Sequence, residues 1–421
     1  MADAAFVFIY LPGQLQPTVA GRFDLEGSPA VGQFVYGESY LANPAALPLD
    51  PIALPLRAQL FKTTLNSGFF GVFRDAIPDD WGRHVATKLY GDQFRSLFDY
   101  LWLPTADRIG ALVFGRTVQR PVDEKPLLSW QDIQGTAYLE AIQKLDRDVP
   151  LTPAEQNVAI VFGAGTSAGG ARPKFTVRKD NAVWLAKLNR QGDRFNEVRV
   201  EAGMLDLAAA CGISVPEHEV QRIHHQDVLL VKRFDRAVTA SGVLRYRMVS
   251  AGTVFQANEA AAQYSYTGSY PQLSRELARW TVTGDQDRRE LFRRIAFNAL
   301  TSATDDHERN HALVAEQDHF RLSLAFDLVP TPGATQKHYL ALVIGEFGAL
   351  AIRENLLSRA QIFQLTRDQA NQVINEVQQV VREQWRAKFS ARDVGTSDIE
   401  RIASCFNPPA FESPAPDVAG L

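Results

Sequence analysis

The chain has 421 residues, of which 46% are hydrophobic and 22% are charged, and its formal net charge is −4. A globular protein of this length can bury two or three hydrophobic cores. The acidic balance argues against broad nucleic-acid binding by this chain alone, because neutralising phosphates needs a clustered excess of Lys and Arg. The two cysteines, Cys211 and Cys405, indicate neither a disulfide framework nor a cysteine-based zinc site.

No part of the sequence predicts a membrane span or a secretory signal. The best apolar run, YLALVIGEFGALAI, is too short to span a bilayer and is broken by Glu346. The first residues, MADAAFVFIY, lack the basic segment of a signal peptide. We therefore expect a cytoplasmic protein.

Residues 1–125 predict a strand-rich N-terminal domain. Short β-type runs (AFVFIYLPG, VAGRFDL, QFVYGESYL and RIGALVFGR) are separated by Gly and Pro. Pro78, Asp79 and Asp80 predict a turn followed by the start of a helix. The charged segment 118–127, with two prolines, predicts a linker into the next domain.

Residues 126–236 predict a small lobe with a glycine-rich loop and a hinge. The run FGAGTSAGGARPKFTV, then KDN, then AVWLAKL predicts strand, turn and strand. Asn196 or Asp193 can cap a helix through VRVEAGMLDLAAACG, which Gly212 would end. VLLVKRFDR then predicts a buried strand that leaves the lobe.

Residues 237–406 predict a mainly α-helical lobe, and the Pro-rich residues 407–421 predict a mobile tail. One long helix is indicated by apolar residues at helical spacing. These are Ile374, Val377, Val381, Trp385 and Phe389.

Four residues form the constellation that a kinase requires. Asp305 and Asn310 are five positions apart in TDDHERN, Asp327 follows in AFDLVP, and Lys187 lies in the strand-like VWLAKL. A protein kinase uses a carboxylate to orient the attacking hydroxyl, an Asn and a second Asp to hold Mg²⁺, and a strand Lys for the nucleotide phosphates. All four residue types occur here in kinase order, although no His-Arg precedes Asp305.

Simpler interpretations remain open for each part of this constellation. The acidic stretch could be a polar helix terminus with Thr304 or Asp305 as N-cap. Lys187 could simply extend to solvent from an apolar run. Its assignment as a nucleotide-binding lysine depends on an ion pair with Glu201, for which Glu197 is the competing partner. The nearby His218, His224 and His225 have no Cys or paired acid beside them and are expected to be surface residues.

The glycine-rich segment 163–170 fits a flexible phosphate-binding loop better than its alternatives. It fails the P-loop pattern, because Ala171 and Arg172 follow Gly170. Residues 165–169 also match G-x-S-x-G, the nucleophile elbow of α/β-hydrolases. That elbow must be followed by a helix, whereas a β-hairpin is expected here. A plain glycine-rich surface loop is the remaining alternative.

Together these motifs resemble the HipA-like serine/threonine kinases, toxins of bacterial type II toxin–antitoxin systems. GESYLANPAALPLDP, FRDAIPDDWGR and DRIGALVFG resemble that family's N-terminal domain. SAGGARPK, WLAKL, RFDR, NALTSATDDHERNHAL and AFDLVP resemble its glycine-rich loop, lysine strand, hinge, catalytic loop and metal motif. The resemblance implies an α+β chain, with a strand-rich N-terminal domain followed by a two-lobed kinase-like region whose C-terminal lobe is mainly α-helical.

The resemblance also assigns roles by position. It implies Asp305 as the catalytic Asp, Asn310 and Asp327 as Mg²⁺ ligands, and Lys187 on the ATP phosphates, with Glu201 as the family's helix Glu. Other nucleotide contacts are implied along the loop and the hinge: Ser167, Gly169, Gly170, Ala171, Val231, Lys232, Arg233 and Phe234. Lys232 stands where many relatives have an acidic residue. Ser167 falls where relatives carry an autophosphorylated serine, whose phosphate could pair with Arg172 or Lys174.

The function implied is transfer of the ATP γ-phosphoryl group to Ser or Thr of a protein, for which the family suggests an aminoacyl-tRNA synthetase. A small helix-turn-helix antitoxin would restrain the toxin, and DNA would be bound only through that antitoxin. The alternative is a non-catalytic partner that keeps this fold and serves in transcriptional autoregulation.

Overall fold

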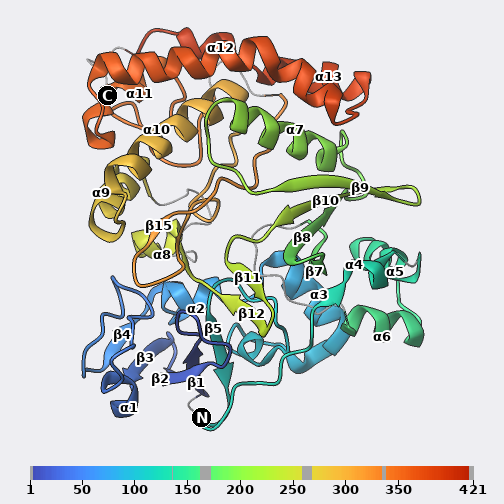
Figure 1. Ribbon diagram of the computed structural model, residues 1–421, viewed down its shortest axis with the longest axis vertical. Coiled ribbons are helices and arrows are strands. Elements are labelled where there is room, and N and C mark those ends of the chain that lie inside the picture. The colour runs from blue at the N-terminus through green and yellow to red at the C-terminus, as the bar shows by residue number, and fades with distance from the viewer. Residues whose placement is uncertain (1–2, 135, 162–171, 258–267, 334–337, 417–421) are drawn as a thin grey trace. The chain divides into compact units, whose positions relative to one another are not determined.

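The computed structural model describes residues 3–134, 136–161, 172–257, 268–333 and 338–416. Its internal contacts form two compact units. The first unit comprises Met1–Gly192, Gln221–Gln263 and Leu313–Asp318, and the second comprises Asp193–Val220, Tyr264–Ala312 and His319–Leu421. Strands and helices are mixed in the chain, which confirms the expected α+β class (Figure 1). Among the described residues, no helix combines the length and apolar character needed to cross a membrane.

The first unit begins with a five-stranded antiparallel sheet of order β4-β3-β2-β1-β5. Its strands are β1 (Asp3–Ile9), β2 (Thr18–Glu26), β3 (Val31–Tyr36), β4 (Phe61–Thr63) and β5 (Leu112–Gly115). Phe23 and Phe34 are opposite each other on β2 and β3, and the Phe73 ring lies 5.1 and 5.5 Å from their rings. The aromatic core explains why the short β-type runs of this region form one sheet.

Short helices connect the strands of this region. They are α1 (Glu38–Leu41), α2 (Gly71–Asp75), α3 (Asp80–Tyr90), η1 (Leu65–Ser67), η2 (Gly91–Gln93) and η3 (Asp99–Trp102). Helix α3 begins at Asp80, as the sequence predicted. Asp79 is its N-cap, because the Asp79 carboxylate accepts a hydrogen bond of 2.7 Å from the Gly82 amide.

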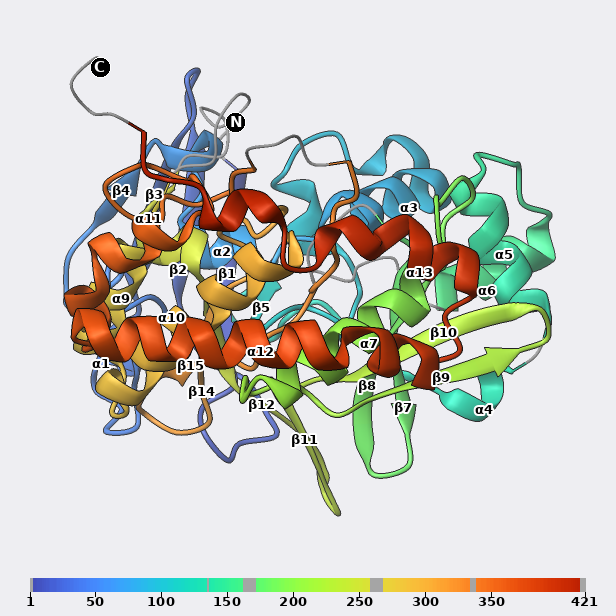
Figure 2. The same ribbon diagram turned by 90° about the horizontal axis from the view of Figure 1, so that it is seen from above.

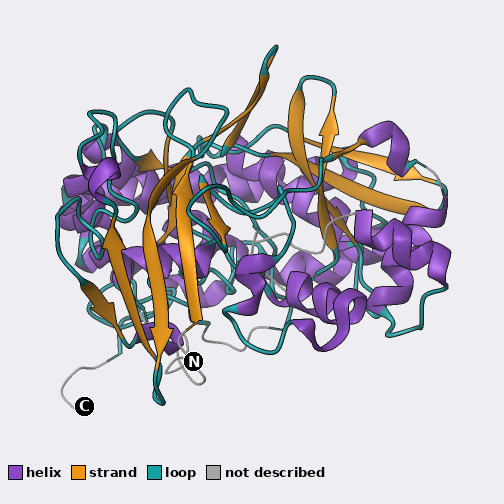
Figure 3. Ribbon diagram, turned by 90° about the horizontal axis from the view of Figure 1, so that it is seen from below, coloured by secondary structure: helices purple, strands orange, loops and turns teal. Residues whose placement is uncertain are grey.

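A second five-stranded sheet has the order β6-β7-β8-β10-β9, and its strands are among those coloured orange in Figure 3. Its strands are β6 (Leu128–Ser129), β7 (Lys174–Lys179), β8 (Ala182–Leu188), β9 (His218–Ile223) and β10 (Gln226–Lys232). The expected hairpin is confirmed, since β7 and β8 pair around Asp180, whose φ is 52°. Three helices precede the hairpin: α4 (Trp130–Ile133), α5 (Thr136–Asp146) and α6 (Pro153–Val161).

Residues 236–250 are extended rather than helical, contrary to the expectation for the region beyond Ala237. They form β11 (Arg236–Thr239), β12 (Gly242–Arg245) and β13 (Arg247–Ser250). Strands β11 and β12 make a hairpin, and β13 lies beside β14 (Ala312–Ala315). Helix α8 (Ala251–Phe255) follows. Each strand has only four residues, which is too short to show a clear two-residue period.

The second unit is mainly helical. Its elements are α7 (Glu197–Ala210), α9 (Tyr270–Trp280), α10 (Gly284–Thr301), β15 (Arg321–Leu322), α11 (Arg353–Ser358), η4 (Ala360–Phe363), α12 (Arg367–Ala391), α13 (Thr396–Ile402), η5 (Ala403–Cys405) and η6 (Pro409–Glu412). Helix α12 packs against α7 and α10 (Figure 2). The five apolar residues predicted to lie on one face of α12 are all buried.

Helix α7 has the predicted boundaries. The Asn196 side chain accepts a 3.2 Å hydrogen bond from the Arg199 amide, and the helix ends before Gly212, whose φ is 75°. A Cβ atom at Gly203 would lie 3.1 Å from the Phe389 ring. The small residue therefore permits the close approach of α7 and α12.

Candidate active site

The acidic loop, residues 303–311, follows the last turn of α10 in the second unit. Helix α10 ends at Thr301, and its C-cap Ser302 has a left-handed conformation with φ 50°. No helix begins at Thr304 or Asp305; the chain stays irregular until β14 starts at Ala312. The interpretation of this stretch as a polar helix terminus is therefore wrong.

The two adjacent acids of the loop have opposite environments. Asp305 is exposed, whereas Asp306 is 5% exposed. One Asp306 oxygen lies 2.8 Å from Nε2 of His311. The other accepts hydrogen bonds from the Tyr270 hydroxyl and, at 2.5 Å, from Nδ2 of Asn298. Asp306 thus anchors the loop to α9 and α10, while its neighbour faces outward.

These contacts keep Asp306 ionised. Burial by itself raises the pKa of a carboxyl group, but the facing His311 and the hydrogen bonds from His311, Tyr270 and Asn298 hold the pKa of Asp306 below its ordinary value. Burial, with the negative charge of Asp306, raises the pKa of Tyr270 well above its ordinary value. Tyr270 therefore remains a neutral donor to the carboxylate.

Asn310 is fixed at the end of the same loop. Its Nδ2 donates a 2.8 Å hydrogen bond to the carbonyl oxygen of Asp305, and its amide donates to the carbonyl oxygen of His307 at 2.9 Å. Because Nδ2 is used in this bond, Oδ1 is the side-chain atom suited to bind a cation. Asp305 and Asn310, five positions apart in sequence, are thus in direct contact.

Asp327 lies on a second loop, residues 324–330, which we call the Asp327 loop. It is half-buried, and its φ of 59° is in the left-handed region that Asp adopts more readily than most residues. Strained backbone of this kind is concentrated at functional sites. The loop itself has no regular secondary structure.

The acidic loop and the Asp327 loop are joined at both ends. Beyond the acidic loop, the carbonyl oxygen of Ala312 accepts a 2.8 Å hydrogen bond from the amide of Ser323, just before the Asp327 loop. Before the acidic loop, the carbonyl oxygen of Ser302 accepts a 2.9 Å hydrogen bond from the amide of Thr331, just after the Asp327 loop. The two loops are therefore tied to each other at both ends within the second unit.

Helix α7 of the same unit carries Glu201, which is 5% exposed. Lys187 belongs to the first unit, so its ion pair with Glu201 stays a prediction. The expectation that His218 lies on the surface is wrong. Its side chain is 8% exposed, with Nε2 3.0 Å from a carboxylate oxygen of Asp206, which also pairs with Arg392.

The first unit holds the residues expected to contact the nucleotide. Lys187 is half-buried on β8, opposite Lys174 on β7 and Leu229 on β10. Val231 is buried and Lys232 exposed at the end of β10. Phe234 follows and is half-buried.

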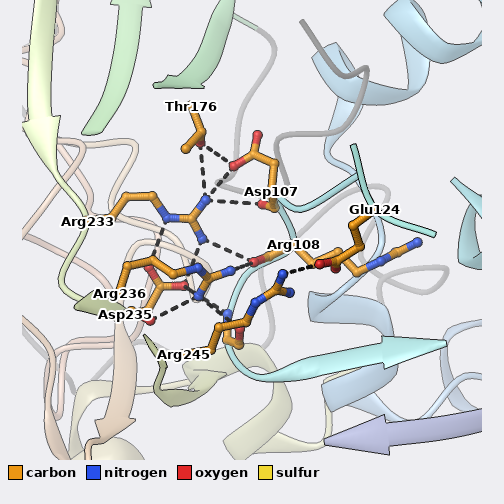
Figure 4. Close-up of polar contacts among 9 residues, drawn as sticks. Asp107, Arg108, Glu124, Thr176, Arg233, Asp235, Arg236 and Arg245 are labelled. Atoms are coloured by element: carbon orange, nitrogen blue, oxygen red, sulfur yellow. Dashed lines mark hydrogen bonds and ion pairs between the residues drawn. The ribbon is translucent and has the colours of Figure 1, made fainter. Parts of the chain in front are cut away.

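The Arg233 side chain is occupied by buried protein groups (Figure 4). Its Nε and one terminal nitrogen donate to the two oxygens of Asp235 at 2.9 and 2.8 Å. The same terminal nitrogen, Nη2, also donates to the carbonyl oxygen of Arg108 at 3.1 Å. The second terminal nitrogen, Nη1, donates to the Asp107 carboxylate and, at 3.2 Å, to the Thr176 hydroxyl. Since all the guanidinium nitrogens are used, a contact from Arg233 to a nucleotide would have to come from its backbone.

The network extends from Arg233 into the following hairpin. Arg236 donates to Asp235 at 2.7 Å and to the carbonyl oxygen of Gly110 at 2.9 Å (Figure 4). Arg245 pairs with Glu124 at its edge. RFDR was expected to be a hinge, and the sequence did not predict this network. Its only local signal was the alternation of Arg and Asp in RFDR and in DRIG.

Burial and pairing act against each other in this network. Burial raises the pKa of a carboxyl group, but Arg233 and Arg236 together hold the pKa of Asp235 below its ordinary value. Burial lowers the pKa of Arg236 to about 9 and raises that of Asp107 to about 6. Asp235 is therefore the carboxylate on which the two arginines depend for compensation.

The assigned loop residues Ser167, Gly169, Gly170 and Ala171 lie outside the described residues. Helix α6 precedes this segment and strand β7 follows it. A nucleophile elbow requires a strand before the serine and a helix after it. Residues 165–169 themselves lie outside the described residues, but the elements that flank them, α6 before and β7 after, stand in the reverse of that order.

Two family models match the chain. The HipA N-terminal domain matches residues 14–115, and the HipA-like C-terminal domain matches residues 166–385, more than half of the chain. The chain belongs to the HipA-like family. The second match includes Lys187, the acidic loop and the Asp327 loop.

Two known proteins are similar over most of this HipA-like chain. The Sinorhizobium fredii protein "Putative kinase Y4mE" is 25% identical over 352 residues, covering 79% of this chain and 80% of that protein. A solved structure of the Shewanella oneidensis toxin–antitoxin complex of HipA, HipB and operator DNA contains a chain with 17% identity and a TM-score of 0.66. The match covers 94% of both chains and shows a shared fold.

The buried network predicts a large cost for removing the Asp235 charge. Asp235→Asn leaves Arg233 and Arg236 without their shared counter-ion, and we expect the free energy of unfolding to fall by about 3–5 kcal/mol. Urea unfolding followed by circular dichroism measures the change. Asp123→Asn is the matched control, because Asp123 is 83% exposed and 3.5 Å from the exposed Arg120. Equal stability of the two variants would contradict the assigned role of Asp235.

Proposed function

We propose that the chain is an ATP-dependent serine/threonine protein kinase and the toxin of a type II toxin–antitoxin pair. The observation that carries this proposal is the pair of loops joined at both ends in a chain of the HipA-like family. The acidic loop supplies Asp305 and Asn310, and the Asp327 loop supplies a second carboxylate. These are the residue types that phosphoryl transfer uses, in the order that protein kinases have them.

The side chains on the two loops suit magnesium. Asn310 Oδ1 and the Asp327 carboxylate are oxygen ligands, and Mg²⁺ in phosphoryl-transfer enzymes is commonly held by one or two carboxylates together with substrate phosphates. The bonded Nδ2 of Asn310 supports this role, because it leaves the oxygen as the ligand. Bound Mg²⁺ would neutralise charge on the phosphates of ATP.

In the proposed reaction Asp305 orients the Ser or Thr hydroxyl and accepts its proton. Its exposure favours contact with a protein substrate, whereas the buried Asp306 holds the loop at a fixed position. Positioning of this kind contributes much of the rate in phosphoryl transfer. Lys187 would bind the ATP phosphates, held by an ion pair with Glu201.

The remaining nucleotide contacts are proposed from sequence position. They would come from Ser167, Gly169, Gly170 and Ala171 of the glycine-rich segment, and from Val231, Lys232, Arg233 and Phe234. Autophosphorylation of Ser167 would shut the enzyme off. An aminoacyl-tRNA synthetase is the proposed protein substrate.

Asp305→Asn and Asp327→Asn should each abolish phosphoryl transfer and leave the fold intact. We expect a loss on the order of 10³-fold or more, because each change removes a charge that acts on the reacting groups. The measurement is incorporation of label from γ-labelled ATP with Mg²⁺, with mass spectrometry of the labelled protein to test Ser167. EDTA should abolish incorporation as well.

Asp285→Asn is the control for these variants, since Asp285 is 74% exposed on α10 and lies outside both loops. It should label at the wild-type rate. Near-normal turnover by a variant that lacks both Asp305 and Asp327 would overturn the assignment. Nucleotide binding by the wild type without any transfer would instead support the non-catalytic alternative.

We further propose a small helix-turn-helix antitoxin as the partner, with DNA bound only in the complex. The similar Shewanella oneidensis chain was solved with HipB and operator DNA, and the net charge of −4 gives this chain little affinity for phosphates by itself.

Co-expression with a neighbouring helix-turn-helix gene product should yield a stable complex. In a mobility-shift assay with operator DNA at physiological salt, the complex should bind and the chain alone should not, because a recognition helix comes from the partner. Tight, sequence-specific binding by the purified chain alone would refute this assignment.

A further inference from the structure

Two lysines lie side by side on one face of the β7–β8–β10 sheet. In the antiparallel register Lys174 of β7 is directly opposite Lys187 of β8, which is in turn opposite Leu229 of β10. Residues that are directly opposite in antiparallel strands project to the same face. Like charges in this position repel one another, so the arrangement requires compensation.

Asp79 provides the compensation. Its carboxylate lies 2.7 Å from Nζ of Lys174, and the two side chains are 1% and 3% exposed. The same carboxylate caps α3 through the Gly82 amide, and the indole nitrogen of Trp81 donates a 3.2 Å hydrogen bond to the carbonyl oxygen of Lys174. The sequence Pro-Asp-Asp-Trp at 78–81 therefore holds β7 by both side chain and backbone.

This pair also corrects an expectation about Lys174. Lys174 was expected to be one of two cations that could pair with a phosphate on Ser167. Its ammonium group is instead buried against Asp79. Arg172 is the other cation named for that role.

A second carboxylate of the N-terminal region contacts the same face of β7. Thr176 lies two residues beyond Lys174, so the two side chains project to one face. Its hydroxyl donates to the carboxylate of Asp107, which also binds Arg233 at the end of β10. The region that matches the HipA N-terminal domain thus contacts the strand after the glycine-rich segment at two successive positions.

The charge of Asp79 has two physical effects on this face. It compensates the buried ammonium group of Lys174. Without this charge the ammonium group would have to move into water, and strand β7 would be displaced with it. The charge of Asp79 also prevents Lys174 from competing with Lys187 for an anionic ligand, because the ammonium of Lys174 is already paired.

We propose that Asp79 is a positioning residue of the nucleotide site, which acts by neutralising and fixing Lys174 beside Lys187. The inference rests on the proposed kinase function. The N-terminal domain is then part of the apparatus that binds ATP, although Asp79 itself touches no substrate.

The test is the affinity of the full-length chain for the magnesium complex of AMP-PNP, a non-hydrolysable ATP analogue, measured by calorimetry. Asp79→Asn keeps an oxygen to cap α3 but removes the charge, and the dissociation constant should rise about tenfold or more. In Asp79→Asn/Lys174→Met neither charge remains, and the affinity should return to within about threefold of the wild type. A purely structural role of the α3 cap would not produce this rescue.

Asp80→Asn is the matched control, because Asp80 is the next residue, is 69% exposed and forms a surface ion pair with Arg83. Its affinity should match the wild type. If Asp79→Asn does not fold, a folded double variant with restored affinity supports the proposal.

Wild-type affinity in a folded Asp79→Asn overturns the proposal, as does a folded double variant that binds weakly. Absence of binding by the wild type would overturn the proposed kinase function together with this inference. Normal wild-type binding with no effect of Asp79→Asn overturns the inference alone.

Discussion

The guanidinium group of Arg233 is the constraint on which the first unit depends. It is buried with two carboxylates that lie far apart in the sequence. Asp235 is two positions from Arg233, whereas Asp107 is 126 positions away. A buried arginine without counter-ions would cost several kcal/mol, so the segment around Asp107, strand β7 and residues 233–236 must take their places together. The network explains why the N-terminal region and the β7–β8–β10 sheet form one compact unit.

A buried carboxylate has the same organising role in the second unit. Asp306 gathers His311, Tyr270 and Asn298, and thereby fixes the loop that presents Asp305. Two neighbouring acids with the same chemistry thus take different roles. The one that is buried and hydrogen-bonded positions the loop, whereas the other is exposed at the surface of the loop.

The N-terminal acids extend this principle to the β7–β8–β10 sheet. Asp79 and Asp107 reach β7 at positions two residues apart, on the face that carries Lys187. The chain matches separate family models for its N-terminal and C-terminal parts, yet these buried contacts cross from one matched part to the other. The polar residues of FRDAIPDDWGR and DRIGALVFG therefore serve the kinase-like region as well as their own domain.

The sequence alone determined the features that depend on local pattern. The KDN turn between β7 and β8, the Asn196 cap of α7, the apolar face of α12 and the spacing of Asp305 and Asn310 could all be recognised from neighbouring residues. Tertiary structure decided the rest. The four-residue strands β11 to β13, the burial of His218, the partners of Arg233 and the division of roles between Asp305 and Asp306 depend on contacts between distant segments. A local pattern shows the spacing of apolar side chains along one helix or strand. The partner of a buried charge instead depends on which elements pack together.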